Sequence, residues 1–322
     1  MSFLLRRLAA LSSASTLVPC ALALAGAWAT GCSRVEPGAD ARTARPVRIV
    51  AASATAVDIA VTVAGLERMA GVPSQALEYS LLHEGRPEPR PIARFDAYLA
   101  EPVLALRPDL VVIDPWQAPE TSAQLRAAGV SVFALPTVRD FPEARAALAA
   151  AGEAFGDADF TARALADFDA RLARVRERRV ERGWRGLAYS NFGGAGSTAG
   201  KGTTIDALFE VLGIVNLVGE RGTVGHTGMT FEDLLALDPD LILVSEPLRM
   251  GDGPSGDRGG AAERILRGDP SLASLRAVRE DRIVALPAWL FATGSHELVT
   301  AAEELERRVA TLAARLAEHE SR

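Results

Sequence analysis

Short aliphatic runs alternate with helix-like stretches along most of the chain. Residues 47–51 read VRIVA, which has the length and β-branched content of a buried strand, and helical periodicity follows over 56–66. The same alternation continues with aliphatic runs at 110–113, 130–135, 186–191, 241–245 and 282–286, and with helical segments at 124–129, 204–212 and 297–317. Strands that alternate with helices in this way predict an α/β fold with mostly parallel sheets.

One motif occurs twice. Residues 101–113 read EPVLALRPDLVVI and residues 232–244 read EDLLALDPDLILV, so both copies follow the pattern E-x-x-L-A-L-x-P-D-L and continue with three aliphatic residues. A Glu suits the positive N-terminal end of a short helix, the Pro ends that helix, and the aliphatic run enters a buried parallel strand. Two such units predict two lobes of similar architecture.

A single helix is expected between the two lobes. Residues 157–182 contain no Gly or Pro and repeat apolar positions at helical spacing. These positions are Phe160, Ala164, Leu165, Phe168, Leu172 and Val175. At 1.5 Å per residue the segment would extend about 39 Å. We expect it to join an N-terminal lobe over 47–156 to a C-terminal lobe over 183–322, and to restrict lobe closure to a small rocking motion.

Residues 1–32 have the layout of an export signal. Arg6 and Arg7 precede an apolar run over 8–28, and the following ATGC resembles a bacterial lipoprotein cleavage box, in which Cys32 becomes the lipidated N-terminus. Residues 33–46 then predict a flexible tether. Two alternatives stay open. The apolar run could be a retained membrane helix, since about 20 apolar residues cross a bilayer of roughly 30 Å, and Cys32 could be a free thiol.

Composition and motif spacing exclude several function classes. The chain is 48% hydrophobic and 24% charged, as globular proteins are, and its formal net charge of −6 without a basic block argues against a nucleic-acid partner. A loop over 195–203 resembles a phosphate loop, but Ala195 and Gly202 break the Walker pattern. The four His residues lack zinc-site spacing, and no G-x-S-x-G elbow is present. We therefore expect a binding protein that is not an enzyme, with neither a metal site nor a cofactor of its own.

The order of these pieces resembles the helical-backbone class of ABC-importer substrate-binding proteins, which capture ferric siderophores, haem or cobalamin. The resemblance covers nearly all of 47–317, including GKGTT at 200–204, LGIVN at 212–216 and DPSL at 269–272. It implies two Rossmann-like lobes with mostly parallel central sheets, joined by one long α-helix, with the ligand cleft between the lobes. It also implies that a Glu on each lobe meets arginines of a permease dimer. By motif position these are Glu101 and Glu232, for which helix capping and solvation are the alternative.

Several side chains are expected to contact the ligand. Aromatic residues make up only 6% of the chain, and many of them fall at predicted strand ends, where ligands bind in open α/β sheets. The expected contacts are Tyr98, Trp116, Tyr189, Phe192, Lys201, His226, Arg249 and Trp289. The two tryptophans offer flat faces to a macrocycle or a catecholate, and Lys201 and Arg249, with Arg94, would neutralise an anionic complex. Tyr79, Tyr98 or Tyr189 could ligate haem iron. A core role for each ring and a surface role for Lys201 are the alternatives.

The resulting expectation is an exported monomer on the periplasmic or cell-surface face, anchored to a membrane by lipid on Cys32. It would hold a small-molecule metal complex, in first place a ferric siderophore, and deliver it to the permease. Cobalamin or haem binding within the same family is one alternative. An exported sensor or scaffold without a transport role is another.

Overall fold

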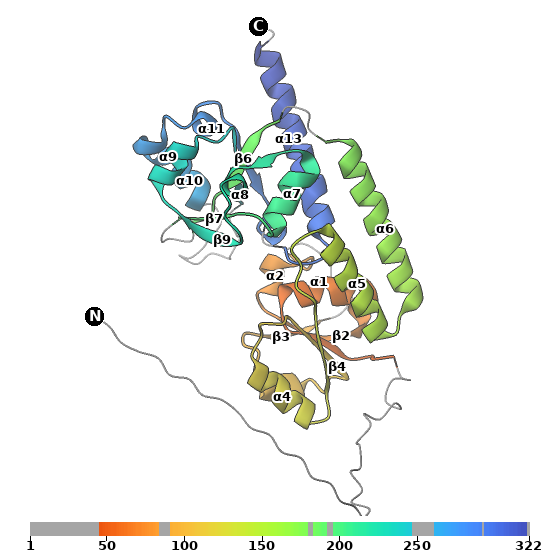
Figure 1. Ribbon diagram of the computed structural model, residues 1–322. Helices are drawn as coiled ribbons and strands as arrows, with labels where there is room; N and C mark the ends of the chain where they lie inside the picture. Colours follow the sequence, from red (N-terminus) through yellow and green to blue (C-terminus); the bar gives the residue numbers. More distant parts are fainter. Residues whose placement is uncertain are drawn as a thin grey trace, which may run out of the picture. The chain divides into compact units, whose positions relative to one another are not determined.

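The computed structural model describes residues 45–83, 91–179, 183–191, 196–246, 261–291 and 293–320, which lie within one compact unit, Ala44–Arg322 (Figure 1). Two parallel sheets and one antiparallel strand pair are arranged in two lobes. None of the helices in these ranges combines the length and the apolar character that a membrane span requires.

The N-terminal lobe contains a sheet of order β3-β2-β1-β4-β5, in which all neighbouring strands are parallel. Its strands are β1 (Ile49–Ala51), β2 (Met69–Pro73), β3 (Ala93–Phe95), β4 (Leu110–Ile113) and β5 (Ser131–Ala134). Its helices are α1 (Ala54–Ala64), α2 (Ala76–Tyr79), α3 (Ala100–Ala105), α4 (Pro119–Ala127) and α5 (Phe141–Phe155). Ile59 of α1 and Leu148 of α5 belong to the core on one face, and Val103 of α3 and Leu125 of α4 to the core on the other. The sheet is therefore covered on both faces, which explains its continuous apolar strands.

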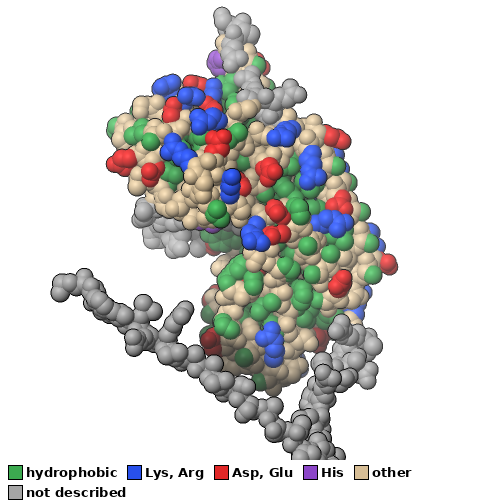
Figure 2. Space-filling view, viewed as in Figure 1, with side chains coloured by type: hydrophobic (Ala, Val, Ile, Leu, Met, Phe, Trp, Pro, Cys, Tyr) green, Lys and Arg blue, Asp and Glu red, His purple; other side chains and the backbone are tan. Residues whose placement is uncertain are grey.

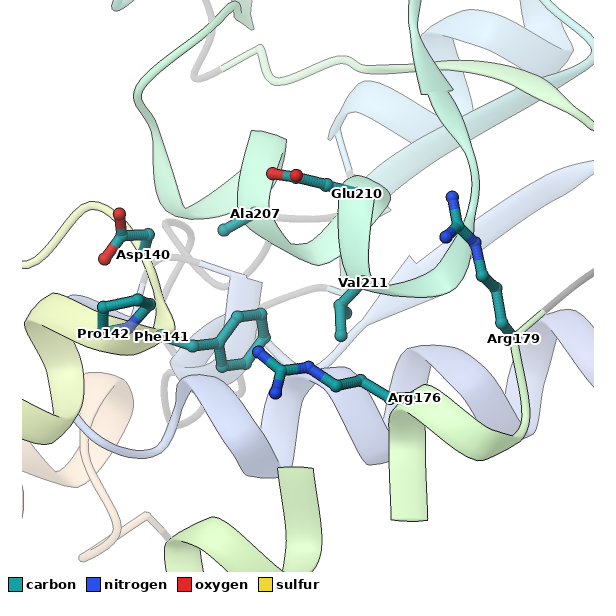
Figure 3. A pocket seen from close by; sticks show the side chains of 8 residues that line it. All are labelled: Asp140, Phe141, Pro142, Arg176, Arg179, Ala207, Glu210 and Val211. Carbon is teal, nitrogen blue, oxygen red and sulfur yellow. The ribbon is translucent and has the colours of Figure 1, made fainter. Parts of the chain in front are cut away.

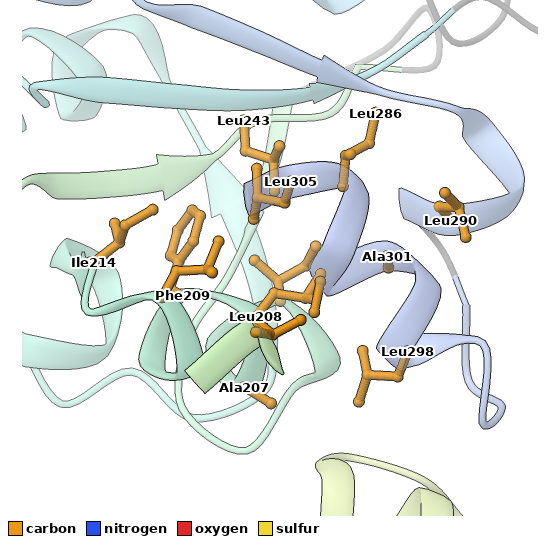
Figure 4. Close-up of a cluster of buried hydrophobic side chains, with 14 of the residues drawn as sticks. Ala207, Leu208, Phe209, Ile214, Leu243, Leu286, Leu290, Leu298, Ala301 and Leu305 are labelled. Carbon is orange, nitrogen blue, oxygen red and sulfur yellow. The ribbon is translucent and has the colours of Figure 1, made fainter. Parts of the chain in front are cut away.

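The C-terminal lobe repeats this layout with a parallel sheet of order β11-β10-β6-β8. Its strands are β6 (Arg185–Ala188), β8 (Val215–Asn216), β10 (Leu241–Ser245) and β11 (Ile283–Leu286), and β7 (Gly196–Ala199) pairs with β9 (His226–Met229) in the antiparallel ribbon. Its helices are α7 (Thr204–Leu212), α8 (Leu217–Glu220), α9 (Phe231–Leu237), α10 (Ala261–Gly268), α11 (Arg276–Arg279), α12 (Ala288–Phe291) and α13 (Leu298–Glu320). Leu208 of α7 and Leu305 of α13 pack with Leu243 of β10 on one face (Figure 4). Leu234 of α9 and Leu266 of α10 belong to the core on the other.

The connecting helix α6 (Ala158–Glu177) enters the cores of both lobes. Ala164 and Leu165 pack against the N-terminal core, whereas Phe168, Leu172 and Val175 belong to the C-terminal core. The helix has 20 residues and ends at Glu177, earlier than the sequence predicts, since the Arg178 N–H bonds to the Val175 carbonyl. At 1.5 Å per residue it is about 30 Å long.

The lobes are also joined by contacts outside α6. Phe141, at the start of α5, belongs to the C-terminal core cluster, and Trp289 packs against the clusters of both lobes. The Ser295 hydroxyl, just before α13, donates to Asp58 Oδ2 of α1 at 2.8 Å. The two lobes therefore share apolar and polar contacts, and their relative motion is restricted by more than one helix.

The repeated motif has the same structural role in both lobes. In each copy a residue in the left-handed region follows the helix and stands immediately before the Pro, Arg107 with φ 48° and Asp238 with φ 38°. The Asp after the Pro then accepts backbone N–H groups at the start of the neighbouring central strand. Asp109 Oδ2 accepts from Val47 and Arg48, both at 2.9 Å, and Asp240 Oδ2 accepts from Arg185 at 3.1 Å.

Backbone bonds complete each of these contacts. The Asp109 N–H donates to the Arg48 carbonyl and the Asp240 N–H donates to the Arg185 carbonyl, at 2.9 and 2.8 Å. We call the Asp109 and Asp240 contacts the aspartate clamps. They fix the register of β1 against β4 and of β6 against β10.

The substitution Asp109→Ala is expected to lower the free energy of unfolding by about 1–2 kcal/mol, because two backbone donors lose a charged acceptor. Asp109→Asn retains an acceptor oxygen and should cost less. Urea unfolding of the two variants measures the difference. A stability of the alanine variant equal to that of the wild type would show that the clamp does not stabilise the lobe.

Candidate ligand-binding site

Segments that follow the carboxyl ends of strands in both sheets meet between the lobes. Residues 80–83 follow β2 and α2, and α12 follows β11. His83 and Trp289 from these two segments stack with ring centroids 4.7 Å apart and planes 10° from parallel. Figure 2 shows the surface hollowed on one side between the lobes. Because ligands in open α/β sheets bind beyond the carboxyl ends of the strands, this region is the candidate site.

A buried carboxylate ties three segments together beside the ring pair. Asp58 of α1 is 1% exposed, and its Oδ1 accepts the Leu81 N–H at 2.7 Å. Its Oδ2 accepts the Ser295 hydroxyl at 2.8 Å, and Ser295 is fully buried just before α13. Asp58 therefore fixes the segment that carries His83 and also joins the N-terminal lobe to the C-terminal lobe.

A second buried carboxyl lies at the end of β4. Asp114 is 3% exposed, and burial raises its pKa to about 6, against the opposing effect of the Ser53 hydroxyl, which bonds to the carboxylate. The Asp114 N–H donates to Gln117 Oε1 at 2.9 Å, and Gln117 Nε2 donates to the Ala52 carbonyl at 2.6 Å. These bonds tie the end of β1 to the turn that carries Trp116.

The predicted aromatic contacts have different environments. Trp116 is 68% exposed and Trp289 is half-buried. Tyr98 is half-buried, with its hydroxyl 3.2 Å from the Ser122 hydroxyl, and burial raises its pKa. Tyr189 has no exposed surface and belongs to a C-terminal core cluster, so it has the core role that was its alternative. Its ring lies against Gly196, where an added Cβ would be 2.4 Å from Tyr189 Cε2.

The predicted polar contacts are separated from the ring pair in the sequence and lie on other elements. Lys201 is exposed and lines a depression of about 470 Å³ beside α7 and α8, together with Asp206 and Asn216. His226 is exposed at the start of β9. Phe192 and Arg249 lie outside the described residues, as does Cys32.

A different pocket, of about 530 Å³, lies among α5, α6 and α7 (Figure 3). It is lined by Asp140, Phe141, Pro142, Arg176, Arg179, Ala207, Glu210 and Val211. None of the side chains that the sequence predicted to contact ligand is among them. Within the ranges that the structure covers, no group of three or more His, Cys, Asp or Glu side chains is arranged to hold a metal ion.

Glu101 and Glu232 occupy matching positions in the first turns of α3 and α9, and both are exposed. At α9 the capping interactions come from Thr230 and Asp233, which bond reciprocally. Glu232 therefore has no part in that capping box, which disfavours the capping alternative at this position. Leu99, the residue at the N-cap of α3, makes no side-chain capping bond.

Sequence reasoning did not select His83, Asp58, Asp114 or Ser295 as site residues. One signal was available for Asp58, which is the single charged residue within the apolar helix ATAVDIAVTVA. A charge in such a helix is buried only when it is paired or hydrogen-bonded. Nothing in the spacing identifies its partner, because Ser295 lies 237 residues away.

Comparisons with known proteins agree with this architecture. The family described as periplasmic binding protein matches residues 49–290. The apo structure of the periplasmic heme-binding protein RhuT from Roseiflexus sp. RS-1 has a TM-score of 0.69 and 25% identity, covering 83% of this chain and 98% of that one. A periplasmic heme-binding protein from Pseudomonas aeruginosa has a TM-score of 0.66 and 26% identity, covering 81% and 91%.

The fold is also that of the vitamin B12 binding protein BtuF of Vibrio cholerae, with a TM-score of 0.62, 20% identity, and coverage of 84% of this chain and 98% of that one. No curated protein matches the chain.

Asp114 makes stability depend on pH. Its folded-state pKa of about 6 lies above the ordinary value of 3.8, so the folded chain binds more protons than the unfolded chain between these values. Stability should therefore fall as the pH rises from about 4 to 6. Asp114→Asn should remove this contribution and be more stable than the wild type at pH 7.5, by about 1–3 kcal/mol.

Urea unfolding at pH 4 and pH 7.5 measures this effect. Asp96→Asn is the control, because Asp96 is exposed and bonds only the Ser74 hydroxyl in the described structure. Parallel pH profiles for the wild type and Asp114→Asn would contradict the assignment.

Proposed function

Because the chain belongs to the periplasmic binding protein family, the non-enzymatic substrate-binding proteins of ABC importers for iron complexes, haem or cobalamin, we propose that it holds a metal chelate between its lobes and delivers it to a membrane permease. The observation that carries this proposal is the meeting of His83 and Trp289 at the carboxyl ends of both sheets. Trp116, largely exposed after β4, adds a third ring on the N-terminal lobe.

Haem is the ligand that these features support best, in place of the ferric siderophore that the sequence placed first. The solved structures at 25% and 26% identity are named as haem-binding proteins. The site also offers flat aromatic faces, which suit a planar macrocycle. A ferric catecholate also presents flat rings, so the siderophore remains the ligand to be distinguished by experiment.

Tyr79 is the tyrosine that we propose as a ligand of the haem iron. Tyr189 is buried in the core. Tyr79 is half-buried at the end of α2, four residues before His83, on the segment that leads from β2 to the ring pair. Phe192, Lys201, His226 and Arg249 remain proposed secondary contacts, the cationic ones for carboxylates of the ligand.

Binding of haem is tested with a chain that begins at Ser33. Haem, cobalamin, a ferric hydroxamate and a ferric catecholate are titrated while tryptophan fluorescence is followed, together with the visible absorbance of haem. Saturable quenching by haem at micromolar concentration or below is expected. Trp116→Ala should weaken the affinity for haem severalfold, because an exposed aromatic face is lost.

Phe160→Ala is the control, since Phe160 is an exposed ring on α6 that contacts Arg163. If none of the four compounds binds, the metal-chelate proposal fails and the sensor or scaffold alternative takes its place. If a ferric catecholate or hydroxamate binds and haem does not, the siderophore assignment replaces haem.

Delivery is proposed to depend on Glu101 and Glu232. Both carboxylates are exposed at matching positions on the two lobes, which suits docking to a two-fold permease with basic residues. We also propose that export and lipidation of Cys32 hold the protein at the membrane.

The double variant Glu101→Gln/Glu232→Gln should reduce ligand uptake by cells roughly 3- to 10-fold, because exposed charge pairs contribute only modestly to the free energy of docking to the permease. The affinity for the ligand should stay unchanged. The control is Glu153→Gln/Glu210→Gln, which neutralises one exposed Glu on each lobe, on α5 and α7, away from α3 and α9. Equal uptake by the two double variants would contradict the docking role.

Cys32→Ser separates anchoring from docking. It should also reduce uptake, but it should release the protein from the membrane fraction, whereas the glutamine variants stay membrane-bound. Retention of Cys32→Ser in the membrane fraction would favour the uncleaved-helix alternative.

A further inference from the structure

The His83–Trp289 pair combines two half-buried rings from different lobes. Trp289 lies on α12, directly after β11, and His83 lies four residues after Tyr79 of α2. Their planes are 10° from parallel, whereas Phe133 and Phe155 of the N-terminal lobe meet edge to face at 75°. A parallel stack of partly exposed rings is the geometry in which a planar molecule contacts an aromatic side chain.

The backbone beneath His83 is fixed, but polar contacts to its ring are few. The His83 N–H donates to the Ser80 carbonyl at 2.9 Å, and the Leu81 N–H donates to Asp58. The His83 Nδ1, in contrast, is buried without a hydrogen-bond partner among the described residues. Stacking on Trp289 is therefore the contact that orients the His83 ring.

The contacts between the lobes differ in how easily they can change. The Asp58–Ser295 hydrogen bond is fully buried, and breaking it would leave a carboxylate without one of its donors. The ring pair is half-exposed and is held by non-directional contact, so its rings can part while the buried bond stays intact. A flat ligand gives each ring a new aromatic face in exchange for the one it loses.

We propose that the His83–Trp289 stack occupies the position of a planar ligand, and that binding parts the two rings so that the ligand lies between them, with one ring from each lobe on its faces. This inference rests on the proposed function and specifies the ligand class as a planar macrocycle. His83 acts in it as a stacking surface and not as an iron ligand. A compact octahedral chelate cannot be sandwiched in this way, so the ring pair selects against it.

Metal-free protoporphyrin IX separates stacking from iron coordination. The affinities of haem and protoporphyrin IX are measured from the visible absorbance of the two ligands for the wild type, His83→Ala, His83→Phe and Trp289→Leu. His83→Ala and Trp289→Leu should weaken both ligands about tenfold. His83→Phe keeps a flat ring without nitrogen and should bind both ligands as the wild type does.

The outcomes distinguish this inference from the proposed function. If His83→Phe loses affinity for haem but not for protoporphyrin IX, His83 ligates iron and the stacking role is overturned. If haem binds and neither His83→Ala nor Trp289→Leu changes its affinity, the ring pair is not the ligand position, although the proposed function stands. If none of the metal chelates binds the wild type, the proposed function fails and this inference falls with it.

Urea unfolding midpoints confirm that each variant is folded. If Trp289→Leu is too unstable to measure, His83→Ala alone tests whether the ring pair is the ligand position. His83 is partly exposed and lies outside the apolar core clusters, so its replacement should not unfold the chain.

Discussion

The aspartate clamps are the constraint on which the rest of the molecule depends. In both lobes a left-handed residue and a Pro end a short helix, and the next residue, Asp109 or Asp240, binds the backbone at the entry of the central strand. This bond sets the register of the central strand pair, and the register determines where the carboxyl ends of the strands lie. Since the segments of the candidate site start at those ends, the repeated pattern of strand entry at one edge of each sheet positions the candidate site at the other edge.

The connection between the lobes determines what the site can do. The helix α6 supplies apolar side chains to both cores, and its Arg171 pairs with Glu303 of α13. Phe141 from the N-terminal lobe packs into the C-terminal core, and Asp58 binds Ser295 across the boundary. A connection with this many packed contacts favours small adjustments over wide opening, so the proposed ligand would be accommodated mainly by movement of side chains at the surface of the site. The half-exposed ring pair is of this kind.

Local patterns in the sequence predicted the fold because its main features are local. The two motif copies specified a helix, a turn and a strand in each lobe, and the apolar spacing of Phe168, Leu172 and Val175 predicted the connecting helix, although its C-terminal end was placed five residues too late. The site could not be predicted to the same extent. Asp58 meets Ser295, and His83 meets Trp289, only after both lobes have folded. For Tyr189 the sequence left a ligand contact and a core role as alternatives, because a residue at a strand end can point into the core or out of it, and here it points into the core.

The candidate site combines two kinds of contact, buried polar bonds that are rigid and partly exposed ring contacts that can change. The buried Asp58 carboxylate organises the backbone around the site, because it accepts hydrogen bonds from the Leu81 N–H and the Ser295 hydroxyl, and the loss of either donor would be costly. Aromatic contacts are less directional and are lost at little cost when another flat surface replaces them. A site built from fixed polar bonds beneath and exchangeable rings above can stay closed without ligand and still admit one. Affinity then depends on how well the incoming molecule reproduces the ring contact that it displaces, which favours a flat ligand over a globular one of equal size.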